Sequence, residues 1–118
     1  MSQNRIPKVP EKRHYQRLQC ELPVRLEYDG EAVSATSDNV SCGGMFLPIN
    51  NINVSEDQPI VAFINLPESA RAVRLTARIK RIEKDPDNKF KGVALEFEGL
   101  YDSNRLEIDR YVKWRLLN

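Results

Sequence analysis

The sequence has no long hydrophobic run. Its longest apolar stretches, such as Ile60 to Ile64, are far too short to cross a bilayer. Residues 1–17 carry charges and two prolines where a secretory signal would need a continuous apolar segment. We therefore expect neither a membrane span nor an export signal, and we predict a cytoplasmic protein.

Cysteine and histidine are scarce, with two cysteines and one histidine in 118 residues. Cys20 and Cys42 are too few for a disulfide framework, and with His14 they cannot complete a four-ligand zinc site without carboxylates. Cys42 and His14 could form a nucleophile and base, but no orienting third group or oxyanion hole is recognisable at a suitable spacing. We expect reduced cysteines, no metal or other cofactor, and no enzymatic activity.

The sequence also lacks a large excess of either positive or negative charge, because its net charge is only +1. A uniformly basic surface that coats nucleic acid is therefore not expected. The charge is unevenly placed, however, and residues 1–17 hold a local excess of four positive charges: Arg5, Lys8, Lys12, Arg13 and Arg17 against Glu11. This distribution indicates an anion-binding end.

What the sequence does contain is an ordinary soluble composition, 41% hydrophobic and 30% charged, in a length that suits one domain. Residues 1–11 include Pro7 and Pro10 and show no apolar period, so we interpret them as a flexible arm. Residues 12–118 then form the single folded domain.

Apolar and polar residues alternate along much of this domain, which predicts half-buried strands. Asp29-Gly30 is a strong hairpin signal, and a change of parity near Lys80 and Arg81 indicates a bulge. The predicted strands are 22–28, 31–40, 45–49, 60–66, 73–82 and 93–97.

After Gly99 the pattern becomes helical, with Asp102 or Ser103 as the cap and no proline or glycine within 104–117. An imperfect apolar stripe, Tyr101, Ile108, Tyr111, Val112 and Leu116, predicts the buried face. Trp114 lies outside the stripe and is available to a partner. About six antiparallel strands followed by one helix predict a mainly β fold, a small closed or nearly closed barrel.

Two short motifs carry the chemistry. In the first, Arg13 and Arg17 are separated by three residues, and two planar guanidinium groups can hold a phosphate or a guanine edge from both sides. In the second, Asn39 and Ser41 stand two apart at the end of a predicted strand and share one face. Gly44 would let a flat ligand approach the backbone.

Asp38 precedes Asn39, and strand alternation sends its side chain to the opposite face. Taken separately, each motif is also compatible with an ordinary charged turn or a turn of Asn, Ser and Gly that satisfies its own backbone.

Together the two motifs resemble the PilZ domain family, whose pattern is RxxxR followed, after a spacer, by [D/N]xSxxG. Arg13 and Arg17 match the first half, and Asn39, Ser41 and Gly44 match the second, with the 21 residues 18–38 between them. The strand around 75–82, the segment 91–97 and the closing helix recur in the family at similar positions. The resemblance covers about residues 12–112.

The resemblance implies a six-stranded antiparallel PilZ-type β-barrel that binds cyclic di-GMP. Arg13 and Arg17 would contact phosphates and guanine edges, with Lys12 as a supporting cation. Asn39, Ser41 and the backbone of Gly43 and Gly44 would line a pocket for one guanine. Because Asn has one acceptor oxygen where Asp has two, pairing with guanine N–H groups is expected to be weaker than with Asp.

The function expected from this resemblance is a cyclic di-GMP receptor and adaptor, whose arginine segment becomes ordered on the ligand and whose signal passes to an effector protein. Two other hypotheses stay open: a small-barrel nucleic-acid-binding protein and a nucleotide-independent interaction module. Nucleic acid is disfavoured by the near-neutral charge and by the lack of an aromatic row on one strand face.

Overall fold

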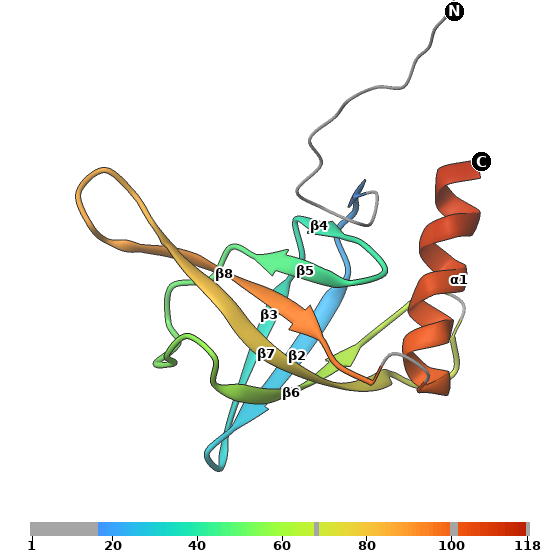
Figure 1. Cartoon of the computed structure of the whole chain (residues 1–118), viewed down its shortest axis with the longest axis horizontal. Coiled ribbons are helices and arrows are strands. Elements are labelled where there is room, and N and C mark those ends of the chain that lie inside the picture. Colours follow the sequence, from blue (N-terminus) through green and yellow to red (C-terminus); the bar gives the residue numbers. More distant parts are fainter. Residues whose placement is uncertain (1–16, 68, 100–101, 118) are drawn as a thin grey trace, which may run out of the picture.

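A curled antiparallel sheet and one helix at its end make up the fold (Figure 1). The computed structural model describes residues 17–67, 69–99 and 102–117. The elements are β1 (Leu18–Gln19), β2 (Pro23–Tyr28), β3 (Glu31–Thr36), β4 (Asn39–Val40), β5 (Gly44–Leu47), β6 (Pro59–Ile64), β7 (Val73–Lys84), β8 (Phe90–Phe97) and α1 (Ser103–Leu117). The expected arm, with Lys12 and Arg13 after it, lies outside the described residues.

The eight strands include the six predicted ones. The predicted strand 31–40 is interrupted and forms β3 and β4, and β1 precedes the predicted strand 22–28 and was not predicted. β1 continues into β2, and β3 into β4; β1 pairs with β4 and β2 with β3. At the junction, Cys20 to Leu22 lie opposite Ser37 and Asp38, so one strand has an extra residue, which bends it. The buried Ser37 hydroxyl fills the gap by donating to the Cys20 carbonyl (2.7 Å) and accepting from the Leu22 amide (2.9 Å).

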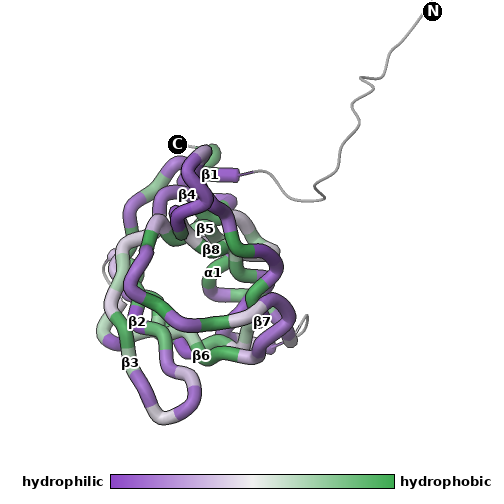
Figure 2. The backbone as a smooth tube through the Cα atoms, turned by 90° about the vertical axis from the view of Figure 1, so that its left-hand side faces the viewer, coloured by the Kyte–Doolittle hydropathy of each residue, from purple (hydrophilic) through white to green (hydrophobic). Residues whose placement is uncertain are grey.

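This bent hairpin joins the two edges of the sheet. The strand order is β1-β4-β5-β8-β7-β6-β2-β3, so β1 and β4 stand at one edge while their continuations β2 and β3 stand at the other. In Figure 2, which is turned by 90° from Figure 1, the backbone of the strands surrounds a central space like a ring. The predicted fold class, mainly β with an antiparallel barrel-like sheet and a C-terminal helix, is confirmed.

The core lies inside the curled sheet, as strand alternation requires. Leu26, Ile64 and Ile79 are fully buried from three different strands, and Ile108 and Val112 add the inner face of α1. The predicted helix stripe is wrong at Leu116, which is 37% exposed. Sequence reasoning also missed that Arg105 is buried on this face (9% exposed), where its polar atoms have partners.

The predicted local signals are present. Asp29 and Gly30 both have positive φ (49° and 78°), as the tight turn between β2 and β3 requires. The β7–β8 register shifts between Ile79 and Arg81, where the bulge is expected. Asp102 caps α1, since its carboxylate accepts from the Asn104 amide at 2.8 Å.

Candidate functional site

The second predicted motif forms the tight connection between β4 and β5. The Ser41 amide donates to the Gly44 carbonyl at 2.8 Å, which closes the turn. The Ser41 hydroxyl donates to the same carbonyl (3.3 Å) and accepts from the Gly43 amide (3.2 Å). Ser41 is only 6% exposed, so its side chain stabilises the turn.

Gly44 is required by the sheet itself. It is the first residue of β5 and lies opposite Glu96 of β8. A Cβ at this position would stand 2.0 Å from the Leu95 carbonyl oxygen, well inside van der Waals contact. The glycine therefore permits two backbones to approach each other, a reason that differs from the ligand approach expected from the sequence.

Arg17 and Asn39 bring the two motifs together. Arg17 directly precedes β1, and β1 pairs with β4 so that Gln19 lies opposite Asn39. The exposed Arg17 guanidinium donates to the side-chain oxygen of the half-buried Asn39. Two residues far apart in the sequence thus form one polar site at the β1–β4 edge.

Asp38 precedes β4, which begins at Asn39, and burial increases along the chain at this edge. Asp38 is exposed, while Asn39 is half-buried and Val40 is fully buried. The Asp38 backbone amide donates to the Phe46 carbonyl at 3.0 Å, which connects this residue to β5. The Asn39 side-chain oxygen accepts a hydrogen bond from Arg17 at this edge.

Helix α1 holds the β4–β5 turn from the other side. The Cys42 thiol donates to the Asp109 carboxylate at 2.5 Å. One helical turn earlier, Arg105 donates to the Cys42 carbonyl (3.2 Å) and to the Phe97 carbonyl (3.3 Å). These charge-assisted contacts connect the turn, the end of β8 and the helix.

The same contacts shift two pKa values. Burial, with the hydrogen bond and negative charge of Asp109, raises the pKa of the Cys42 thiol from 9.0 to about 12, against the opposing effect of Lys113 and Arg105. The hydrogen bond from Cys42 lowers the pKa of Asp109, helped by Lys113 at 3.4 Å. Cys42 thus stays a protonated donor near neutral pH, which is unfavourable for a nucleophile.

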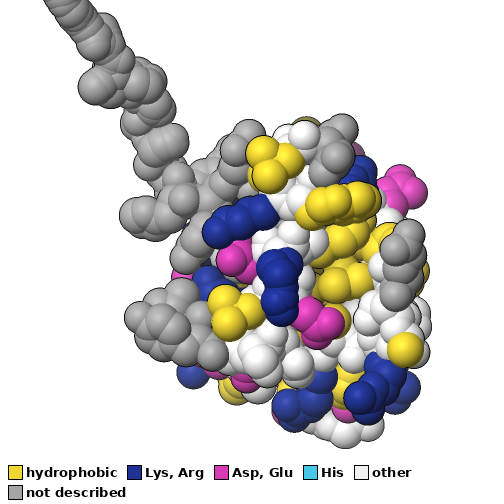
Figure 3. All heavy atoms as spheres, turned by 90° about the vertical axis from the view of Figure 1, so that its right-hand side faces the viewer, with side chains coloured by type: hydrophobic (Ala, Val, Ile, Leu, Met, Phe, Trp, Pro, Cys, Tyr) yellow, Lys and Arg dark blue, Asp and Glu magenta, His cyan; other side chains and the backbone are white. Residues whose placement is uncertain are grey.

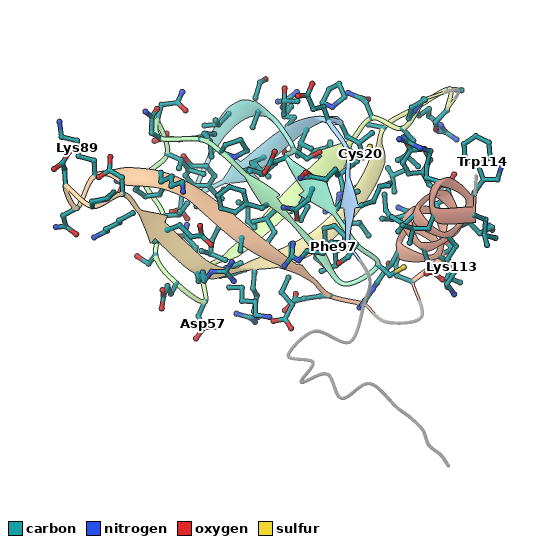
Figure 4. All side chains as sticks on the ribbon, turned by 90° about the horizontal axis from the view of Figure 1, so that it is seen from above. Cys20, Asp57, Lys89, Phe97, Lys113 and Trp114 are labelled. Atoms are coloured by element: carbon teal, nitrogen blue, oxygen red, sulfur yellow. The ribbon has the colours of Figure 1, made fainter. Side chains whose placement is uncertain are left out.

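Cys20, just after β1, makes a second contact with α1. Its sulfur lies 3.5 Å from the Tyr111 hydroxyl, and Arg115 donates to that hydroxyl at 2.7 Å. Arg115 also lies 3.6 Å from the Cys20 sulfur. Burial and the bond with Cys20 raise the pKa of Tyr111. In Figure 4, Cys20 lies on the side of the sheet that faces the helix, whereas Trp114 points away from it.

The outer side of α1 forms a partly apolar, partly cationic surface (Figure 3). Trp114 is 59% exposed there, and a hollow of about 400 Å³ is lined by Pro67, Arg110, Tyr111, Trp114 and Arg115. A second hollow of about 390 Å³ lies beside Tyr28 and Glu98. The linings of these two hollows do not include Arg17 or Asn39.

The described residues contain no group of three or more potential metal ligands. Within that same part of the chain, no helix has the length and apolarity that a membrane crossing needs. Sequence reasoning missed Arg105 and Asp109, because nothing in a charged amphipathic helix marks which of its polar residues face a turn that is distant in the sequence.

Several solved structures have the same fold. The motility inhibitor MotI/DgrA of Bacillus subtilis matches with a TM-score of 0.75 and 23% identity over 92% of this chain, which spans only 53% of that protein. The PilZ domain of YcgR from Escherichia coli, solved with c-di-GMP, matches with a TM-score of 0.71 and 13% identity, covering 90% of this chain and 92% of that one. The PilZ domain of CeSA from a cellulose-synthesizing bacterium gives 0.67 and 19%, covering 87% and 99%.

No curated protein matches the chain. The structural matches are all below 25% identity and by themselves establish the fold. The model of the PilZ domain, however, matches residues 11–114, nearly the whole sequence. This chain therefore belongs to the PilZ domain family.

Proposed function

We propose that this PilZ domain is a receptor for cyclic di-GMP and that it signals through a protein partner. The observation that carries the proposal is the contact between Arg17 and Asn39, which joins the two sequence motifs at one exposed edge. The YcgR domain, a fold relative over nearly its full length, was solved with c-di-GMP and supports the same ligand class.

The residues at this edge suit an anionic nucleotide. Arg17, together with Arg13 and Lys12, supplies cations for the two phosphates, and a guanidinium fork can also reach a guanine edge. Asn39 offers an amide that can both donate to and accept from guanine. Binding exchanges the Arg17–Asn39 hydrogen bond for bonds with the ligand, so the free protein keeps both side chains aligned at the site.

Ser41, Gly43 and Gly44 contribute through the shape of the turn. The Ser41 hydroxyl is already engaged with its own turn, so its role is to fix the backbone against which a base can lie. Because Gly43 adds no side chain, a planar base can approach that backbone closely. Gly44 contributes by letting β5 pack against β8.

Ligand binding orders the segment before Arg17. The sequence of residues 1–11 has few apolar groups, and phosphate contacts of Arg13 and Arg17 would offset the entropy lost when this segment becomes ordered. Amide exchange of residues 8–18, with 93–97 as the internal reference, should slow mainly in the arm when saturating ligand is added. Equal exchange with and without ligand would show that the switch lies elsewhere.

The signal then passes to another chain. The exposed Trp114 and the cations beside it on α1 supply a surface that a partner can contact. A catalytic role has little support, because the Cys42 thiol is protonated near neutral pH. A nucleic-acid platform is also poorly supported, since every large hydrophobic side chain exposed in the described residues belongs to α1 and none to a strand.

Calorimetric titration with cyclic di-GMP tests the proposal, with GTP and single-stranded DNA as controls. Saturable heat with cyclic di-GMP alone is the expected result. Binding of DNA would favour the nucleic-acid alternative, and no binding of any of the three would favour a nucleotide-independent interaction module.

A further inference from the structure

Both halves of the candidate site are connected to α1 through a cysteine. Cys20 follows Arg17 by three residues and contacts Tyr111. Cys42 follows Asn39 by three residues and donates to Asp109. Helix α1 therefore contacts the chain three residues after Arg17 and three residues after Asn39. Arg17 and Asn39 themselves do not belong to α1.

The connection to Cys42 is the stronger one. The Asp109 carboxylate accepts a hydrogen bond from the Cys42 thiol, and the Arg105 guanidinium donates to the carbonyl of the same residue, so that α1 holds both the side chain and the backbone of Cys42. Cys42 is 8% exposed and Arg105 is 9% exposed, and competition from water is accordingly weak. The turn from Ser41 to Gly44 cannot shift without breaking at least one of these bonds.

We propose that Asp109 and Arg105 are positioning residues for the ligand-binding turn, and that α1 senses ligand occupancy through Cys42. This inference rests on the proposed function, because it concerns the same site. Binding that fixes the turn also fixes α1, and by thermodynamic reciprocity any change that loosens α1 from the turn weakens the ligand. Helix α1 is thus the route from the nucleotide to the surface around Trp114.

The first test is the affinity for cyclic di-GMP of variants of the Cys42–Asp109 bond. Cys42→Ala and Asp109→Ala should each weaken binding about fivefold to tenfold, the loss expected for one hydrogen bond. Cys42→Ser keeps a donor and Asp109→Asn keeps an acceptor, so both should bind nearly as the wild type does. The double alanine variant should be no worse than either single variant, because both remove the same bond.

Glu107→Ala is the matched control, since Glu107 is an exposed carboxylate on the same helix. Each titration is made at a temperature at which denaturation curves show the variant to be folded. A merely structural bond would lower the unfolding temperature and leave the affinity of the folded protein unchanged, and that result would overturn the proposal.

Trp114 provides an independent readout, because it is the one tryptophan of the chain and lies on α1. Its fluorescence should change when cyclic di-GMP binds to the wild type or to Cys42→Ser, and the change should be smaller in Asp109→Ala at saturating ligand. A full response in Asp109→Ala would show that α1 senses the ligand by another route, and would overturn the sensing role of Cys42.

A measurement without ligand separates this inference from the proposed function. Amide exchange of Gly43 and Gly44 should be faster in Asp109→Ala than in the wild type, whatever the protein binds. If the wild type does not bind cyclic di-GMP but this exchange is faster, the ligand is wrong and the positioning role stands. If the exchange is unchanged, α1 does not hold the turn.

The pH dependence of stability tests the same bond. Charged or titratable groups that face Cys42 are Asp109, Lys113 and Arg105, all from α1. The native thiol keeps its proton to about pH 12, whereas the unfolded thiol loses it near pH 9.0, so the free energy of unfolding should fall between these values. Cys42→Ser should lack that part of the decline. Identical curves above pH 9 would contradict the buried donor role of Cys42.

Discussion

The two halves of the candidate site differ in how strongly the fold depends on them. Arg17 is an exposed residue directly before the first strand, and it donates to a side chain of the site, that of Asn39. Ser41, Cys42 and Gly44 are buried, and each makes a contact that the sheet or α1 needs. The first half can therefore be changed with little effect on folding, whereas the second half joins binding and stability.

The largest effect should come from Gly44→Ala, because the added methyl group would meet the Leu95 carbonyl oxygen at 2.0 Å. We expect a loss of about 3 kcal/mol or more in the free energy of unfolding, at the upper end for overpacked sites. Urea denaturation measures it. Gly30→Ala is the control: its Cβ meets nothing within 4 Å, so only the strain of its positive φ, about 1 kcal/mol, should appear. Equal losses would mean that Gly44 is not under steric constraint.

Arg17→Ala should weaken cyclic di-GMP binding about tenfold to a hundredfold, since a charge-assisted contact contributes roughly 1.5–3 kcal/mol. Arg13→Ala should have a similar effect. Stability should stay within about 0.5 kcal/mol of the wild type, as for other surface changes. Arg25→Ala, which removes an exposed arginine from a β2 ion pair with Glu27, is the control for lost charge. If either Arg17→Ala or Arg13→Ala bound cyclic di-GMP with unchanged affinity, that arginine would not contact the ligand as proposed.

Asn39→Ala should cost about tenfold in affinity, through the loss of its amide contacts with guanine. Asp38→Ala should change affinity less than about twofold, because Asp38 is exposed and strand alternation predicts that its side chain points away from the face of Asn39. Asn39→Asp should bind at least as well as the wild type, since a carboxylate also accepts from Arg17. Titration of the three variants decides the order; a greater loss from Asp38 than from Asn39 would place the ligand on the opposite face.

The smallest effect on binding should come from Trp114→Ala. The indole is 59% exposed on the outer side of α1, so the ligand affinity should be unchanged and stability should fall by less than about 0.5 kcal/mol. Calorimetry and denaturation provide the two values. A clear loss of affinity would mean that the outer face of α1 contributes to the ligand site itself.

Much of the fold could be predicted because it depends on local patterns. Alternation of apolar and polar residues predicted the strands, and Asp29-Gly30 predicted the hairpin. The change of this alternation near Lys80 predicted the bulge. The interruption at Ser37 was not predicted, since an extra residue on one strand is visible only when its partner strand is known. Asn39 and Arg17 were predicted as site residues from their resemblance to a family pattern, and their contact depends on the β1–β4 pairing.

The sequence by itself determined the class of fold and the set of polar residues available for a ligand, because hydrophobic period, turn residues and motif spacing are local properties. Only the tertiary structure decided which of those residues also hold the fold together. Gly44 is needed because β8 passes close to it, and Cys42 is a donor because α1 packs beside the turn. Both facts depend on the close approach of segments distant in the chain, where packing and desolvation act, and no local pattern encodes that approach.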